Sequence, residues 1–192
     1  LRGVYHEELK MRYNFIKSKF KLELPHGIKV HFARLRPANF PTLRLAQLAQ
    51  VYSKSGALFE DVVRQQSPQN CYTLFDVKAG TYWNTHYNFD SKSRSHTKKI
   101  SRGFFDLLLI NTLIPIRFAY AKYKGRSGEE SLFEWAATVP SENNRILSRF
   151  KSLEVPQINA ISCQSILHLY KKYCKLKKCL SCQVGFELMK LK

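Results

Sequence analysis

The feature that most constrains this chain is an apolar segment from Gly103 to Tyr123, with the sequence GFFDLLLINTLIPIRFAYAKY. It is the most apolar stretch of the sequence, and we interpret it as a central, buried helix. Pro115 predicts a kink or an interruption, because proline lacks an N–H donor and its ring clashes with the preceding turn. Asp106 and Asn111 then need hydrogen-bond partners, since an unpaired buried polar group costs about 1–3 kcal/mol.

The same segment bears on whether the protein enters a membrane. Its apolar run from Phe104 to Ile116 contains Asp106, Asn111 and Pro115 and falls short of the roughly 20 apolar residues that a spanning helix needs. The first twenty residues are charged throughout, so no signal peptide is visible. An odd number of cysteines, five, argues against a secreted disulfide framework. We therefore expect a cytoplasmic protein with no membrane partner.

Most of the remaining sequence also predicts helices. From His6 to Lys21, apolar residues alternate with Lys and Arg at near-helical spacing. The alternation in Ile28–Phe32 indicates a short strand or an extended arm, and Cys71–Val77 suits either a strand or a helix. Further helices are expected from Pro41 to Ser55, over Ala57–Arg64 and Glu129–Thr138, after a cap at Ser141, and over Ile158–Lys175. The fold class is therefore mainly α: a compact multi-helix domain with a central apolar helix and at most one or two short strands.

The length of 192 residues favours one domain. We divide it into a helical core domain, residues 1–157, and a C-terminal helix with a Cys-rich tail, residues 158–192, which packs on the same domain. Pro156 separates the two parts.

The charge of the chain is strongly unbalanced. Against 32 Lys and Arg stand only 14 Asp and Glu, which gives a net charge of +18. Such an excess favours anionic partners, namely nucleic acid, acidic lipid or an acidic protein face. The alternative is a basic solvated surface that serves only solubility or docks on an acidic domain.

A basic loop bounded by prolines, RLRPANFP, leads from Arg34 into the helix that begins at Pro41. Pro37 and Pro41 disfavour helical backbone in the residues before them, so this loop has a defined shape. Arginine beside aromatic rings suits phosphate and base contacts. The residues expected to contact nucleic acid are Arg34, Arg36, Asn39, Arg44, Lys98, Lys99 and Arg102.

Other interpretations of these basic residues stay open. Arg34 and Arg36 can face inward as partners of Asp106 or Glu60. The run Ser91–Arg102 contains several Lys and Arg and no acid, which is typical of a solvated loop. We expect Arg34 to point inward and Arg36 outward.

Four of the five cysteines lie near the C-terminus, and three of them have metal-ligand spacing. Cys174, Cys179 and Cys182 form a C-x4-C-x2-C arrangement, which suits a structural zinc ion or an iron–sulfur cluster. Cys163 lies about 16 Å earlier along a helix, at 1.5 Å per residue, and His168 is also too distant. A fourth ligand is therefore missing, and a set of reduced or redox-active thiols is the alternative.

An aromatic segment, TYWNTHYNFD, contains His86 and Asp90 four residues apart. On a helix the two side chains would share a face and form an acid–base pair or two metal ligands. The alternative is that the rings pack on the core while His86 and Asp90 fix the turn by hydrogen bonds. No nucleophile or second acid stands beside them, so we assign no catalytic residue.

Four motifs together resemble a known family. RPANFPTLRLAQLA, YWNTHYNFD, INTLIPIRFAYAKY and YCKLKKCLSCQVG occur in this order, and they resemble domain-of-unknown-function family 2851, a bacterial, Bacteroidetes-like family. The resemblance covers nearly the whole chain. It implies that the chain is the C-terminal, helical half of proteins about twice as long, whose N-terminal half is β-rich and looks like the PD-(D/E)xK nuclease fold. It also implies that the C-x4-C-x2-C part is characteristic and that Cys163 is not. No nuclease motif stands in this chain, so no catalytic residue is carried over.

Three functions are compatible with these features. The first is a non-catalytic, basic accessory domain of a larger bacterial protein that contacts nucleic acid. The second is the helical half of a nuclease-like hydrolase whose catalytic residues lie in the other half. The third is a scaffold that docks on its own N-terminal domain.

Overall fold

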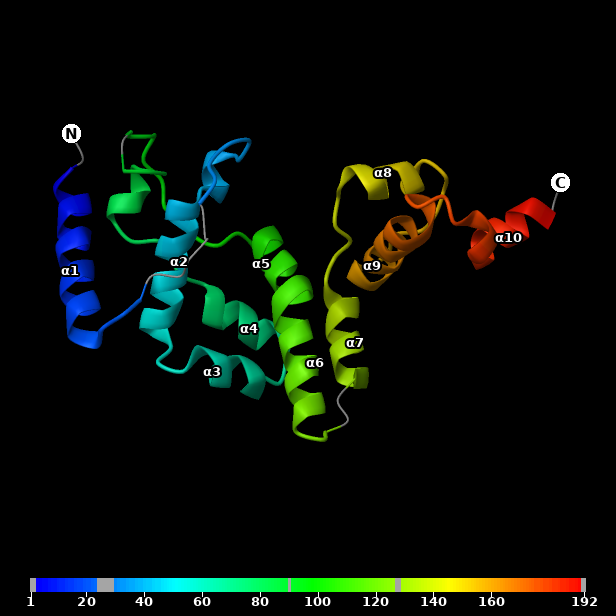
Figure 1. The fold of residues 1–192 in the computed structure, drawn as a ribbon, viewed down its shortest axis with the longest axis horizontal. Helices are drawn as coiled ribbons and strands as arrows, with labels where there is room; N and C mark the ends of the chain where they lie inside the picture. The colour runs from blue at the N-terminus through cyan, green and yellow to red at the C-terminus, as the bar shows by residue number, and fades with distance from the viewer. Residues whose placement is uncertain (1–2, 24–29, 90, 127–128, 191–192) are drawn as a thin grey trace. The chain divides into compact units, whose positions relative to one another are not determined.

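The computed structural model describes residues 3–23, 30–89, 91–126 and 129–190 (Figure 1). It confirms the mainly α fold class. The chain divides into two compact units, unit 1 from Leu1 to Arg102 and unit 2 from Gly103 to Lys192. This division differs from the predicted boundary after residue 157, because the last long helix packs with other helices of unit 2.

Unit 1 is built from short helices joined by loops. Pro41 and Pro68 occupy the first turn of α2 and α4, where a missing N–H costs nothing. The Ser67 hydroxyl oxygen caps α4 by accepting from the Asn70 N–H at 3.2 Å, so the ambiguous Cys71–Val77 stretch is largely helical. The elements are α1 (Val4–Phe20), a 3-10 turn (Pro37–Asn39), α2 (Pro41–Lys54), α3 (Leu58–Arg64), α4 (Pro68–Phe75) and a second 3-10 turn (Tyr82–Asn84).

An aromatic cluster forms the centre of unit 1. Leu43 of α2 packs there with Ala79 and Trp83, and half-buried rings surround these three. Tyr5 of α1 stacks on Tyr82 with ring centroids 4.0 Å apart and planes 15° apart. Because α1 has no buried residue of its own, the stacking of Tyr5 on Tyr82 attaches this helix to the aromatic cluster. The remaining cluster members are Ala46, Tyr87 and Phe89.

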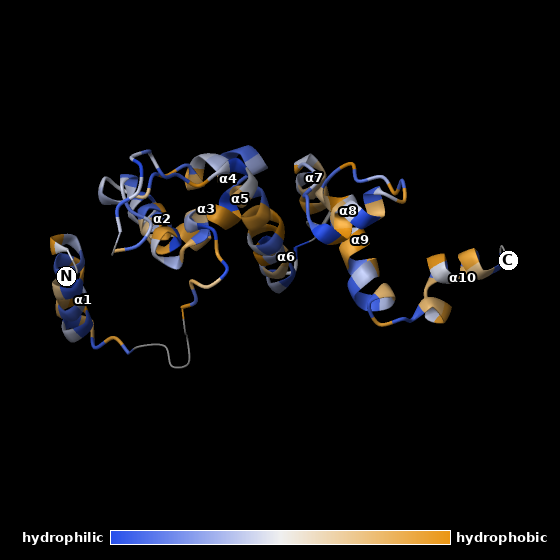
Figure 2. Cartoon of the chain, turned by 90° about the horizontal axis from the view of Figure 1, so that it is seen from above, coloured by the Kyte–Doolittle hydropathy of each residue, from blue (hydrophilic) through white to orange (hydrophobic). Residues whose placement is uncertain are grey.

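The apolar segment forms one continuous helix, Arg102–Tyr123, of 22 residues. It consists of α5 (Arg102–Leu108), a π-helical turn (Leu109–Leu113) and α6 (Ile114–Tyr123). The π-turn stands where the kink was predicted, because the Pro115 ring would clash with the carbonyl of Asn111 in a regular α-helix. Figure 2 shows the hydrophobic residues of α5 and α6.

This helix is less buried than predicted. Only Phe105, Leu109 and Leu113 are buried in it, and 17% of its most apolar window lies inside the structure. Asn111 is exposed and its amide donates to the Leu107 carbonyl at 2.9 Å, so it needs no partner from another element.

The apolar run was also expected to be too short to span a membrane. By length and composition alone, the helix that contains it is long and apolar enough. The helix continues through Pro115 to Tyr123, which gives it the length and the mean hydropathy of a membrane-spanning helix. One such helix does not establish a membrane protein, because core helices of soluble proteins meet the same criteria.

Unit 2 contains the remaining helices. They are α7 (Glu129–Thr138), α8 (Arg145–Lys151), α9 (Ala160–Leu169), a π-helical turn (Tyr170–Cys174), a 3-10 turn (Cys179–Ser181) and α10 (Gln183–Lys190). Leu147 of α8 packs against Cys163, Ile166 and Leu167 of α9. This aliphatic cluster anchors the unit.

Two helix starts in unit 2 differ from prediction. Asn144, and not Ser141, caps α8, because its side-chain oxygen accepts from the N–H groups of Ile146 and Leu147, each at 3.0 Å. Pro140, shortly after α7, pairs with Asn159 in an isolated antiparallel bridge. Asn159 in turn begins α9 through a capping box.

Strands are almost absent from the described residues, which contain only isolated bridges: Lys78–Lys99, His86–Lys92 and Pro140–Asn159. The predicted strand Ile28–Phe32 lies partly outside the described residues, and its part from Val30 to Phe32 is not a strand.

Candidate functional site

The loop before α2 has a defined and uncommon backbone. A turn closes with a bond from the Leu35 N–H to the Phe32 carbonyl at 3.3 Å, and Arg34 inside it has φ 62°. Left-handed backbone at a residue with a Cβ costs roughly 1–2 kcal/mol. Arg34 and Arg36 are both exposed. The prediction that Arg34 points inward is therefore wrong, since the turn directs it to solvent.

Arg44 connects this loop to α2. Its two terminal nitrogens donate to the Asn39 side-chain oxygen at 2.6 Å and to that of Gln47 at 2.8 Å. Gln47 is only 2% exposed, and burial lowers the pKa of Arg44. The hydrogen bond from Arg44 to Asn39 thus holds the loop in place. Of the predicted contacts in this region, Arg34, Arg36 and Asn39 are exposed and Arg44 is half-buried.

Lys98 has a different role from the one predicted. It is only 4% exposed, and its ammonium donates to the carbonyls of Trp83 at 2.6 Å and Asn84 at 2.9 Å. It also donates to the Ser93 hydroxyl at 3.3 Å and lies 4.2 Å from the centre of the Tyr87 ring. Burial lowers its pKa. Lys98 therefore fastens the loop around it and is not a solvent-facing contact for nucleic acid.

The neighbours of Lys98 in the sequence remain at the surface. Lys92 and Arg94 are exposed. Lys99 is exposed too, and its ion pair with Asp76 spans 3.8 Å, which in water contributes little. Arg102 lies over the Tyr72 ring, with its guanidinium carbon 3.2 Å from the ring centre. These four cations form the exposed charge of the segment 91–102.

Both basic loops attach to the same aromatic cluster. The Thr42 hydroxyl, in the first turn of α2, donates to the Tyr87 carbonyl at 2.5 Å. The Tyr87 hydroxyl lies 3.3 Å from the His96 ring nitrogen in the second loop. We call the exposed cations of these two loops the basic surface of unit 1: Arg34, Arg36, Lys92, Arg94, Lys99 and Arg102.

His86, predicted either as half of an acid–base pair or as a residue that fixes a turn, packs against an aromatic ring. His86 stacks on Tyr82 at 4.1 Å with planes 5° apart, and its Nδ1 lies 3.1 Å from the Tyr82 carbonyl. Asp90 lies outside the described residues, so the pair is untested. These contacts of His86 are those of a residue that fixes a turn.

The three cysteines with ligand spacing line one cavity of about 610 Å³ in unit 2. Cys174 and Cys179 are exposed, Cys182 is buried, and all are free thiols. Cys163 lies apart, in the aliphatic cluster. The described part of the chain has no group of three His, Cys, Asp or Glu side chains arranged to hold a metal ion. The positions of these three thiols therefore do not fit zinc or an iron–sulfur cluster. Metal binding itself is untested and stays a prediction.

Comparison with known proteins gives a family. Residues 1–145 match the model of the family described as Protein of unknown function (DUF2851). The match ends before the four C-terminal cysteines, so the C-x4-C-x2-C motif lies outside it, whereas the resemblance was expected over nearly the whole chain. No curated protein and no solved structure matches the chain. Because the match covers more than half of the sequence, the chain belongs to the DUF2851 family, whose function is unknown.

Proposed function

We propose that unit 1 is a non-catalytic nucleic-acid-binding module that recognises the phosphate backbone. The observation that carries this proposal is the placement of Arg34 and Arg36. Both are exposed on a loop whose shape is fixed by a left-handed residue, two prolines and the Arg44 hydrogen bonds. A loop held in this way presents its guanidinium groups at little further loss of conformational entropy.

The chemistry of the basic surface suits phosphate. Guanidinium groups form paired hydrogen bonds with phosphate oxygens. The segments 30–39 and 91–102 contain no Asp or Glu to compete with the phosphates. Phe32, in the same loop as Arg34, is 40% exposed and offers a ring against which an unpaired base can stack. Such contacts favour sequence-independent binding.

Salt dependence tests the proposal. The protein is titrated with a fluorescent single-stranded DNA oligonucleotide at several salt concentrations, and the slope of log affinity against log salt is measured. Each phosphate contact adds roughly 0.7 to the slope for single strands. Arg34→Gln with Arg36→Gln is expected to reduce the slope by about 1.4, the equivalent of two such contacts.

A matched control separates position from net charge. Arg149→Gln with Lys151→Gln removes the same charge from exposed positions of α8 in unit 2, and it should leave the slope nearly unchanged. A flat salt response of the unaltered protein contradicts the proposal, and so does an equal loss in the two double variants.

A second candidate function has its own observation. On one face of α1, Val4, Met11 and Phe15 are 78%, 65% and 68% exposed, more apolar surface than a solvated helix needs. We propose it as a docking face for another domain of the same protein, consistent with the implied position of this chain as the helical half of a longer bacterial protein. Met11→Ser with Phe15→Ser should abolish association with that domain in size-exclusion chromatography while leaving DNA affinity intact.

The nuclease-like alternative assigns no catalytic residue to this chain. Its test is Mg²⁺- or Mn²⁺-dependent cleavage by a longer protein that includes this chain, with this chain alone as the inactive control.

A further inference from the structure

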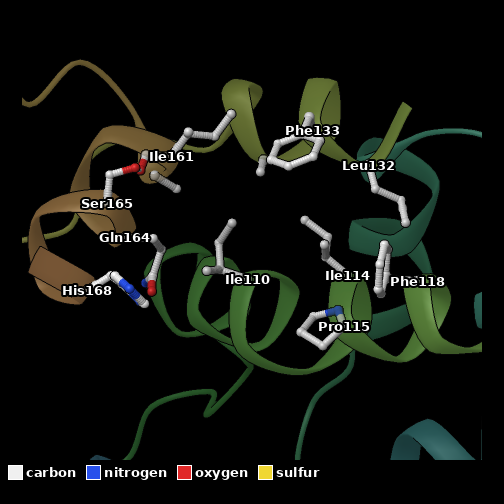
Figure 3. Close-up of a pocket in the computed structure, with 12 residues that line it drawn as sticks. Ile110, Ile114, Pro115, Phe118, Leu132, Phe133, Ile161, Gln164, Ser165 and His168 are labelled. Carbon is white, nitrogen blue, oxygen red and sulfur yellow. The ribbon is translucent and has the colours of Figure 1, made fainter. Parts of the chain in front are cut away.

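A groove of about 650 Å³ runs between the long apolar helix, α7 and α9 of unit 2 (Figure 3). Ile110, Ile114 and Phe118 line one side, and Leu132 and Phe133 of α7 line another. Ile161 of α9 contributes to the third. The volume is in the range of small-molecule sites, roughly 300–1,000 Å³.

Three residues with short or compact side chains line the groove. Ala136 of α7 and Ala160 of α9 line it, and these two helices contact each other. On the long helix, Pro115 lines it directly after the π-helical turn. None of these three residues has a side chain long enough to fill the groove.

The polar groups of the groove gather at one end. Gln164, Ser165 and His168 lie on one face of α9, and Figure 3 shows the side chains of Gln164 and His168 pointing to the same place. The Ser165 hydroxyl donates to the Ile161 carbonyl at 3.0 Å. In the described structure no hydrogen bond occupies the side chains of Gln164 and His168. Both are therefore open to a ligand.

We propose that this groove binds a single-chain amphiphile with a carboxylate head, such as a long-chain fatty acid. The apolar chain lies along the isoleucine and phenylalanine walls, and the head accepts hydrogen bonds from Gln164 and His168. A docked amphipathic helix fits less well, because it would place apolar anchors in the groove and leave Gln164 and His168 without partners.

The neighbouring charges favour a carboxylate at the His168 end. A second cavity, of about 430 Å³, shares Gln164 with the groove and contains Asp106 and Glu142. His168 lies one helical turn beyond Gln164, about 6 Å along the axis, and is not part of that acidic cavity. Lys171 and Lys172 follow within the next turn. The two cations that follow His168 are exposed, and His168 itself does not line the cavity that contains the acids.

Isothermal titration of the protein with oleate, below its micelle concentration, tests the site. Ala136→Phe fills the groove and should weaken oleate binding at least tenfold. Val184→Phe places the same ring in the cysteine-lined cavity and should leave binding unchanged. Circular dichroism confirms that each variant keeps its helices. No saturable binding by the unaltered protein, or equal loss in the two variants, overturns the proposal.

The head group is tested with a second ligand. His168→Ala with Gln164→Ala should weaken oleate binding several-fold but leave that of dodecanol, which carries no charge, nearly unchanged. An equal effect on both ligands overturns the assignment of a carboxylate to this end. Neither result depends on nucleic-acid binding, which is assigned to unit 1.

Discussion

The two units of this chain stabilise their interiors by different means. Among the described residues, all three buried polar side chains, Gln47, Ser55 and Lys98, belong to unit 1. The buried residues of unit 2 are apolar side chains and thiols, including Leu147 and Cys163. Polar bonds in unit 1 specify the shape of loops, whereas unit 2 relies on aliphatic packing and helix caps. Different substitutions should therefore weaken each unit.

The largest expected effect is in the aliphatic cluster of unit 2. Leu147 is fully buried, so Leu147→Ala leaves a cavity and should cost about 2–5 kcal/mol. Denaturant unfolding measures it. Leu153→Ala, at a position 71% exposed, is the control and should change stability by less than about 0.5 kcal/mol. Equal effects would mean that this cluster does not anchor the unit.

The corresponding change in unit 1 is Lys98→Met. It keeps an unbranched chain but leaves the carbonyls of Trp83 and Asn84 without their buried donor, which costs about 1–3 kcal/mol. Hydrogen exchange should show faster opening of the segment 82–98 and no change in α8 and α9. Unchanged exchange in that segment would show that Lys98 does not fasten it.

A smaller effect distinguishes the observed helix cap from the predicted one. Asn144→Ala removes the acceptor of two N–H groups at the start of α8 and should destabilise the protein by about 1 kcal/mol. Ser141→Ala should be nearly neutral in the same thermal unfolding experiment. The opposite order would support a cap at Ser141.

The smallest effect is a dependence on pH. Burial lowers the pKa of Lys98 from 10.5, so just below pH 10.5 the unfolded chain holds more protons on this group than the folded chain. The contribution of Lys98 to the unfolding free energy therefore rises as the pH rises through this window. The difference in unfolding free energy between the unaltered protein and Lys98→Met should grow in favour of the unaltered protein as the pH approaches 10.5. A difference that shrinks would contradict the lowered pKa.

The helices and the basic loop could be predicted from the sequence because their signals are local. Proline in the first turn of α2, apolar periodicity in α1 and the apolar run up to Tyr123 each act within a few residues. The turn that exposes Arg34 was missed, because an arginine in left-handed backbone has no sequence signal as clear as a glycine.

The role of Lys98 could not be predicted for another reason. Within a run of basic residues it looks identical to Lys99, yet Lys98 meets carbonyls 14 and 15 residues earlier. The amphiphile groove was missed similarly, since its walls come from three helices. Ala136 and Ala160, which line it, are small, but a single sequence does not show which positions share a cavity.

Lysine acetylation read by mass spectrometry tests the central claim most directly, because it compares neighbours within unit 1. Lys98 is 4% exposed, whereas the Lys99 side chain is 61% exposed. Brief acetylation should modify Lys92 and Lys99 rapidly in the free protein and more slowly with single-stranded DNA bound, and it should leave Lys98 unmodified in both states. Modification of Lys98 as fast as Lys99, or no protection of Lys92 and Lys99 by DNA, would contradict the account.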